Sequence, residues 1–93
     1  MNSSPESRSI IVILLVEVAE NSYRYDRYVK VPLYARARIP EAWIVDLLHG
    51  TLEVFRAPGP TGYASALRVE RGGSIAPSAF PNVIVAVDEI LPP

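Results

Sequence analysis

The chain has 93 residues, of which 49% are hydrophobic and 20% are charged, and its formal net charge is −1 at pH 7. These values are typical of one small globular domain, and a net charge so near zero neither favours nor excludes a nucleic-acid partner. The absence of cysteine excludes disulfides and thiolate metal sites and suits a reducing compartment.

An apolar run, Ile10–Val16, follows a polar leader of residues 1–9 that we expect to be flexible. The run resembles part of a signal peptide, but Glu17 and Glu20 stand where a cleavage site needs small residues. It is also far shorter than the about 20 residues of a membrane span. We therefore expect a cytoplasmic protein with no membrane partner. The β-branched composition predicts a strand over Ile10–Val18 that is buried on both faces.

A helical pattern follows over Tyr23–Ala37, with Asn21 or Ser22 as the predicted N-cap. Pro32 lacks a backbone donor and should kink this helix or divide it in two. Projection at the helical period places four side chains in one stripe, namely Asp26, Lys30, Leu33 and Ala37.

Three further strands are predicted downstream, over Ala42–Leu47, Thr51–Phe55 and Tyr63–Val69. Gly50 is available for the positive φ of the tight turn between the first two. Because a helix connects Ile10–Val18 to Ala42–Leu47, these two strands should be parallel neighbours in a β-α-β unit, with the earlier strand inside the sheet.

The C-terminal tail is less regular. Residues 74–82 should wrap the sheet edge with Phe80 as the anchor, before a short strand over Val83–Val87 and a helical turn over Asp88–Leu91. The fold class that we predict is α/β (α+β), a mixed β-sheet with a β-α-β unit and a C-terminal β-hairpin.

Glu17 is the strongest candidate functional residue, because it is a carboxylate at the end of an apolar strand. Such a group is costly to bury unless it is paired or coordinates a cation. The alternative is a strand end that simply reaches water.

Lys30, the only lysine, could extend from the helix back towards Glu17. The alternative is an ordinary i, i+4 ion pair between Asp26 and Lys30 on the helix surface. The two interpretations are compatible.

Basic residues are concentrated between Arg24 and Arg38, a stretch that contains five of them and only one acid, Asp26. This local surplus suits contact with phosphates, although a solvated helix face is the commoner explanation. The candidate nucleic-acid-binding residues besides Lys30 are Arg24, Arg27, Arg36 and Arg38.

Three segments closely resemble the Uma2 family of restriction endonucleases in the PD-(D/E)XK nuclease superfamily. They are LLVEVAENSYRYDRYVKVPLYARARIPEAWIVDL, LEVFRAPGPTGYASALRV and IAPSAFPNVIV, and the likeness covers about Ile11 to Leu91. The resemblance implies a mixed sheet flanked by helices, DNA as the substrate, and phosphodiester hydrolysis that depends on Mg²⁺ or Mn²⁺.

The resemblance also implies roles for individual residues. Glu17 matches the metal-binding acid of the V-E-V strand, and the backbone carbonyl of Val18 would be a further metal ligand. Lys30 matches the lysine that orients or activates the attacking water, in place of a lysine at the position of Ala19. The Glu17 carboxylate and the Lys30 amine should then lie within about 8 Å of each other, with room for one metal-bound water.

The chain departs from the family pattern upstream of this strand, because no aspartate precedes Glu17. Family members are considerably longer and carry a first metal-binding aspartate there. We therefore expect residues 10–93 to form a partial Uma2-type domain that binds Mg²⁺ weakly or not at all and is inactive alone. The alternative is a non-catalytic remnant that binds DNA or protein. An uncovered sheet edge would favour self-association.

Overall fold

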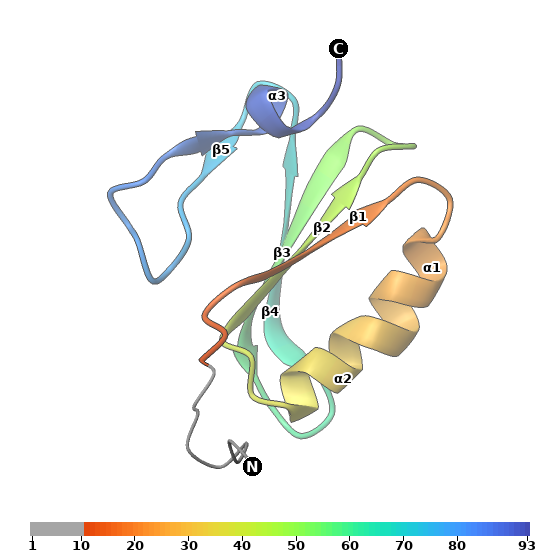
Figure 1. The fold of residues 1–93 in the computed structure, drawn as a ribbon, viewed down its shortest axis with the longest axis vertical. Helices are drawn as coiled ribbons and strands as arrows, with labels where there is room; N and C mark the ends of the chain where they lie inside the picture. Colours follow the sequence, from red (N-terminus) through yellow and green to blue (C-terminus); the bar gives the residue numbers. More distant parts are fainter. Residues whose placement is uncertain (1–10) are drawn as a thin grey trace, which may run out of the picture.

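The computed structural model describes residues 11–93, in which four strands form one mixed sheet (Figure 1). The leader predicted over residues 1–9 lies outside this range. The strand order is β1-β2-β3-β4, with β1 and β2 parallel and the other neighbours antiparallel. These strands are β1 (Leu15–Ala19), β2 (Glu41–Asp46), β3 (Thr51–Pro58) and β4 (Tyr63–Glu70). The predicted fold class and the parallel β-α-β unit are confirmed.

The helix between β1 and β2 contains a wider turn in its middle. It consists of α1 (Tyr23–Tyr25), the π-helical turn η2 (Asp26–Lys30) and α2 (Val31–Arg36), which follow one another as a single coil (Figure 1). In η2 the Val31 N–H donates to the Asp26 carbonyl, five residues earlier. We attribute the wider turn to Pro32, which in a regular α-helix would lack a donor and would press its ring against the carbonyl four residues before it.

The π turn changes which helix residues face the sheet. Val31 and Ala35 are buried, whereas Leu33 is 48% exposed. The stripe predicted from the sequence therefore does not face the sheet in its second half, where Leu33 and Ala37 are exposed. The extra residue of a π turn rotates everything after it by about 100° relative to a regular α-helix.

Each face of the sheet carries its own apolar cluster. The helix-facing cluster consists of Ala19, Val31, Ala42, Ile44 and Phe55. The opposite cluster consists of Trp43, Val45, Leu52 and Val54 from the sheet, with Val87 and Leu91 from the C-terminal segment. The helix and the C-terminal segment thus cover opposite faces (Figure 1).

The C-terminal segment forms a second, two-stranded sheet, in which β5 (Ser74–Ile75) pairs with β6 (Val85–Ala86), followed by α3 (Val87–Ile90). Phe80, the predicted anchor, is 51% exposed, so that prediction is wrong.

A buried carboxylate, Glu41, anchors this segment instead. It accepts hydrogen bonds from the Ser78 N–H at 2.8 Å, the Arg56 Nε at 2.9 Å and the Trp43 Nε1 at 2.7 Å. Arg56 also donates to the carbonyl of Ala76 at 2.6 Å. Three donors around one carboxylate satisfy a group that would otherwise be costly to bury.

The first strand is shorter and more exposed than predicted. It begins at Leu15, and within residues 11–93 it pairs with β2 alone, so it is an edge strand and does not lie inside the sheet. Val16 is 47% exposed and Val18 is 60% exposed. The apolar composition suggested burial on both faces, but no described segment covers the outer face or the second edge.

No helix in the described part of the chain is long and apolar enough to cross a membrane. The cytoplasmic location expected from the sequence stays a prediction.

Candidate active site

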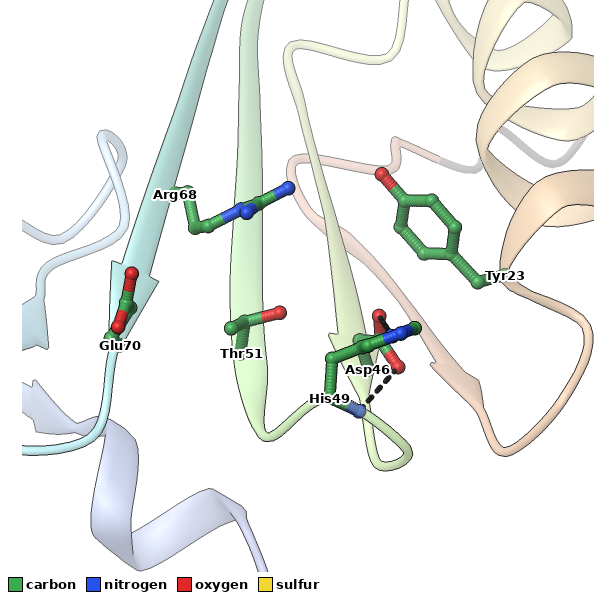
Figure 2. Close-up of a pocket in the computed structure, with 6 residues that line it drawn as sticks. All are labelled: Tyr23, Asp46, His49, Thr51, Arg68 and Glu70. Carbon is green, nitrogen blue, oxygen red and sulfur yellow. Dashed lines mark hydrogen bonds and ion pairs between the residues drawn. The ribbon is translucent and has the colours of Figure 1, made fainter.

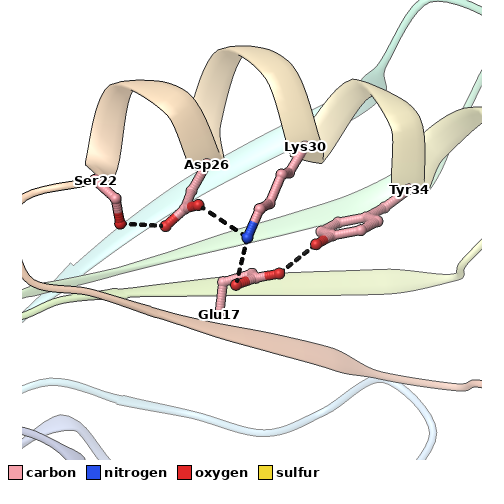
Figure 3. Close-up of polar contacts among 5 residues, drawn as sticks. All are labelled: Glu17, Ser22, Asp26, Lys30 and Tyr34. Atoms are coloured by element: carbon pink, nitrogen blue, oxygen red, sulfur yellow. Dashed lines mark hydrogen bonds and ion pairs between the residues drawn. The ribbon is translucent and has the colours of Figure 1, made fainter.

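Glu17 lies on β1 with its side chain under the helix (Figure 3). Alternation along the strand places it on the same face as Ala19, which is buried in the helix-facing cluster. Its parallel neighbour on β2 is Ile44, and its own side chain is 22% exposed. The carboxylate is therefore partly shielded from water by the helix above it.

Three helix residues and the preceding serine complete a polar cluster around Glu17 (Figure 3). The Lys30 Nζ lies 3.4 Å from Glu17 Oε1 and 3.4 Å from Asp26 Oδ1. The Tyr34 hydroxyl donates to Glu17 Oε2, and the Ser22 hydroxyl donates to Asp26 Oδ2 at 3.0 Å. The predicted proximity of Glu17 and Lys30 is confirmed, but their direct contact at 3.4 Å leaves no room for the water that was expected between them. The Asp26–Lys30 ion pair is present as well.

Ser22 stands at the predicted N-cap position but does not cap the helix with its side chain. Its backbone carbonyl accepts the Asp26 N–H at 2.9 Å, while its hydroxyl is directed to the Asp26 carboxylate. The Ser22 hydroxyl, which at an N-cap would normally accept a free helix N–H, therefore belongs to the polar cluster instead.

The carboxylates of the cluster keep Lys30 and Tyr34 protonated at neutral pH. Partial desolvation lowers the pKa of Lys30, but the charge of Glu17 and the hydrogen bond and charge of Asp26 outweigh it, so the pKa of Lys30 is raised above its ordinary value. Burial, together with the hydrogen bond to Glu17, raises the pKa of Tyr34 as well. Lys30 is therefore an ammonium and Tyr34 a neutral donor.

The structure adds Asp26 and Tyr34 to the site predicted from the sequence. Asp26 is only 2% exposed, although the sequence suggested a surface ion pair. The signal that could have found both is the spacing of Asp26, Lys30 and Tyr34 at i, i+4 and i+8 opposite the carboxylate of Glu17.

The backbone carbonyl of Val18 is directed away from β2. The neighbouring Ala19 carbonyl accepts the N–H of Leu47, beyond the end of β2, at 2.8 Å. Because successive carbonyls of a strand point to opposite edges, that of Val18 faces the edge of β1 that no described strand occupies. Its role as a metal ligand stays a prediction.

The four candidate DNA-binding arginines differ in accessibility. Arg24, Arg36 and Arg38 are exposed. Arg27 is half-buried, with its guanidinium 4.6 Å from the centre of the Phe55 ring and 5.3 Å from that of Tyr28. Packing against these rings leaves Arg27 less available than the other three, and contact of any of them with DNA stays a prediction.

A separate pocket of about 370 Å³ opens on the same face of the sheet (Figure 2). It is lined by Tyr23, Asp46, His49, Thr51, Arg68 and Glu70, and so excludes Glu17 and Lys30. His49, an exposed residue of the hairpin turn, places its Nδ1 2.8 Å from Asp46 Oδ2. The lining contains acidic, basic and uncharged side chains together, so it does not define one class of ligand.

Tyr23 connects this pocket to a further buried carboxylate, Glu53. The Tyr23 hydroxyl donates to Glu53 Oε1, and burial, with that hydrogen bond, raises the pKa of Tyr23 to about 12. Glu53 is in register with Ile44, which is in register with Glu17. The backbones of Glu17 and Glu53 are therefore two strands apart, about 10 Å.

The described residues do not complete a coordination set for Mg²⁺. Nowhere between residues 11 and 93 do three or more Asp, Glu or His side chains gather closely enough to hold a metal ion. At Glu17 an ammonium already lies between two carboxylates. Mg²⁺ needs octahedral oxygen ligation, with carboxylates supplemented by water or phosphate oxygens, so Glu17 offers one ligand of such a set.

Comparison with known families identifies the class of this domain. The mixed sheet with a crossing helix is consistent with a nuclease-like α/β fold. Residues 3–88 match the model of the Uma2 family, which is described as "Putative restriction endonuclease". The chain therefore belongs to the Uma2 family. A search of curated proteins found no match.

Proposed function

We propose that this protein acts in DNA cleavage as a Uma2-type endonuclease that hydrolyses phosphodiester bonds with Mg²⁺ or Mn²⁺. The observation that carries the proposal is the 3.4 Å contact between Glu17 and Lys30, in a chain of this family. A bound divalent cation would supply an activated water at Glu17. Exposed Arg24, Arg36 and Arg38 would contact the phosphate backbone on either side.

Lys30 has a geometry suited to a phosphate oxygen. Its ammonium carries three N–H groups, and two of them have partners in Glu17 and Asp26. The third has no partner among residues 11–93, so it can donate to a scissile phosphate or to the attacking water. Tyr34 would keep Glu17 in place while it binds a ligand.

A second carboxylate is needed at this site, and we propose that it arrives along the open edge of β1. Glu17 belongs to the strand that forms this edge, and the Val18 carbonyl faces the edge itself, where a further strand would pair. Without this carboxylate we expect Mg²⁺ to bind weakly or not at all, and the chain to be inactive by itself.

Plasmid nicking with Mn²⁺, and with EDTA as the control, tests the function. We expect background activity from the chain alone and metal-dependent nicking from a fusion in which the upstream part of a longer Uma2 protein precedes residues 10–93. An inactive fusion that is folded would overturn the proposed function. Nicking by the chain alone that is lost in Glu17→Ala would show that no second carboxylate is needed.

A non-catalytic DNA-binding role is the second candidate, and the exposed arginines of the helix favour it. It predicts a fusion that binds DNA without cleaving it. Its affinity should fall steeply with salt, as expected for phosphate contacts, and Arg36→Ala should weaken it.

We further propose that the chain alone self-associates through the open edge of β1, where Val16 and Val18 are exposed. At micromolar concentration, sedimentation velocity should show dimers or larger species. Val18→Lys should shift the population towards monomer, because a charge on an edge strand disfavours pairing. The control is Leu48→Lys, in the turn between β2 and β3 and not on β1, where Leu48 is 69% exposed. A monomeric wild-type chain would contradict this proposal.

A further inference from the structure

Two of the five tyrosines are exposed, and both lie on the helix between β1 and β2. Tyr25 is 58% exposed and Tyr28 is 64% exposed. The hydroxyls of the other three donate hydrogen bonds within the fold, and these residues are Tyr23, Tyr34 and Tyr63. A single exposed ring on a protein surface needs no special explanation. Tyr28 differs because another side chain holds its ring in place.

Arg27 connects the ring of Tyr28 to the core. Its guanidinium lies 4.6 Å from the centre of the Phe55 ring and 5.3 Å from the centre of the Tyr28 ring. Both distances are within the about 6 Å of a cation–π interaction. Because Phe55 is only 1% exposed, the stack is anchored in the core and ends at a ring that is mostly in water. An aromatic ring that is already oriented loses little conformational entropy when a ligand packs on it.

The surface around Tyr28 is cationic. Arg24 is exposed and lies four residues before Tyr28, which places both side chains on the same side of the helix. The one acid between residues 23 and 36 is Asp26, and it is 2% exposed. Since no other carboxylate belongs to this helix, a phosphate beside Tyr28 would meet positive charge without repulsion from the helix.

We propose that Tyr28 and Arg24 bind unpaired nucleotides of DNA. One base stacks on the ring of Tyr28, and the guanidinium of Arg24 binds a neighbouring phosphate. The ligand is single-stranded DNA, because the faces of a base within a duplex are covered by the adjacent base pairs, whereas every unpaired base offers a free face. The proposal rests on the proposed function, since it names the form of DNA that this domain binds.

This contact lies outside the candidate active site. Asp26 and Lys30 extend from the helix towards Glu17 (Figure 3). Tyr28 is two residues from each of them, so it projects from the opposite side of the helix. A helix with its side chains is about 10–12 Å across, so a base on Tyr28 belongs to a nucleotide away from the cluster at Glu17. Tyr28 is therefore a binding residue and not a catalytic one.

Fluorescence anisotropy with the 93-residue chain tests the proposal. The probes are a labelled oligothymidine of about 20 nucleotides, which exceeds the usual site of about 4–16, a duplex of equal length, and a strand of abasic sites with as many phosphates. All solutions contain EDTA. The variants are Tyr28→Ala, Tyr28→Phe and Arg24→Ala. The matched control is Phe80→Ala, which removes a ring that is 51% exposed in the C-terminal segment.

Tyr28→Ala should bind the oligothymidine about 5- to 100-fold more weakly than the wild type, the usual effect of losing one stacked base. It should bind the duplex and the abasic strand as the wild type does. Tyr28→Phe keeps the ring and should match the wild type with every probe, and so should Phe80→Ala. Arg24→Ala should weaken binding to all three probes and reduce the salt dependence for the single strand by about 0.7 in log–log slope.

Equal binding of oligothymidine by the wild type and a folded Tyr28→Ala would overturn the proposal, as would a wild type that does not bind the strand. An equal loss with the abasic strand, or a Tyr28→Phe as weak as Tyr28→Ala, would also show that no base stacks on the ring. Circular dichroism establishes that each variant is folded, and Tyr28→Leu replaces Tyr28→Ala if the latter is not. A failed nicking assay beside retained single-strand binding would contradict the endonuclease function alone.

Discussion

Glu17→Gln is expected to abolish metal-dependent cleavage by the fusion, with a loss of at least about a hundredfold, since misplacement by about 1 Å already costs that much. Glutamine matches glutamate in size, but only its amide oxygen accepts, so it can keep one of the two hydrogen bonds that Lys30 and Tyr34 donate to different oxygens of Glu17. It lacks the negative charge that draws a divalent cation, and it leaves the Lys30 ammonium with Asp26 alone. Initial nicking rates over a range of Mn²⁺ concentrations measure the loss.

The matched control is Glu20→Gln, an exposed glutamate just beyond the same strand. It should cleave at the rate of the parent fusion. Full activity in Glu17→Gln would remove Glu17 from the site, and with it the assignment of Lys30. Equal losses in both variants would indicate a general effect of negative charge near the strand end.

Glu41→Ala is expected to destabilise the domain by about 3–5 kcal/mol, the usual effect of removing one partner of a buried ion pair. Glu41 is 1% exposed, and its loss leaves the Arg56 Nε, the Trp43 Nε1 and the Ser78 N–H without their acceptor. Because small domains have only about 5–15 kcal/mol of stability, the C-terminal segment should detach or the whole domain unfold. Urea denaturation measures the change, and Glu20→Ala is the control.

The same carboxylate gives the stability a pH dependence. Burial alone would raise the pKa of Glu41, but the hydrogen bonds from Trp43, Ser78 and Arg56 and the Arg56 charge lower it below 4.5. The folded state thus binds a proton less readily than the unfolded state. The stabilisation from Glu41 is complete above pH 4.5 and is lost as the pH falls through the lowered pKa. The free energy of unfolding of Glu41→Gln should therefore fall less between about pH 6 and 3 than that of the wild type; an equal fall would contradict this assignment.

Local patterns in the sequence were sufficient to predict the part of the site that β1 and the following helix form. A strand that leads into a helix and then into a parallel strand leaves Glu17 and the early helix at one end of the sheet. Lys30 is long enough to span the remaining gap. The depth of Asp26 was not predicted, because an Asp–Lys pair at i, i+4 is usually exposed on a helix surface. The π turn instead displaced Leu33, since no regular helical projection contains its extra residue.

The anchoring of the C-terminal segment could not be predicted for a different reason. Glu41 is bound by donors 15 and 37 residues further along the chain, Arg56 and Ser78. The sequence favoured Phe80 instead, because it is a large hydrophobic residue in an irregular segment with Pro77 and Pro81, and such a side chain is expected to be buried. Similarly, the apolar composition of β1 predicts burial on both of its faces, but on the face opposite the helix Val16 and Val18 are exposed in the part of the chain that the structure describes.

The cluster around Glu17 is built almost entirely from one continuous stretch, Ser22 to Tyr34 together with β1. The contacts from Lys30 and Tyr34 to Glu17 span only 13 and 17 residues. Short loops close quickly and at low entropic cost, so this half of the site should assemble before the C-terminal segment docks, because the contact from Ser78 to Glu41 spans 37 residues.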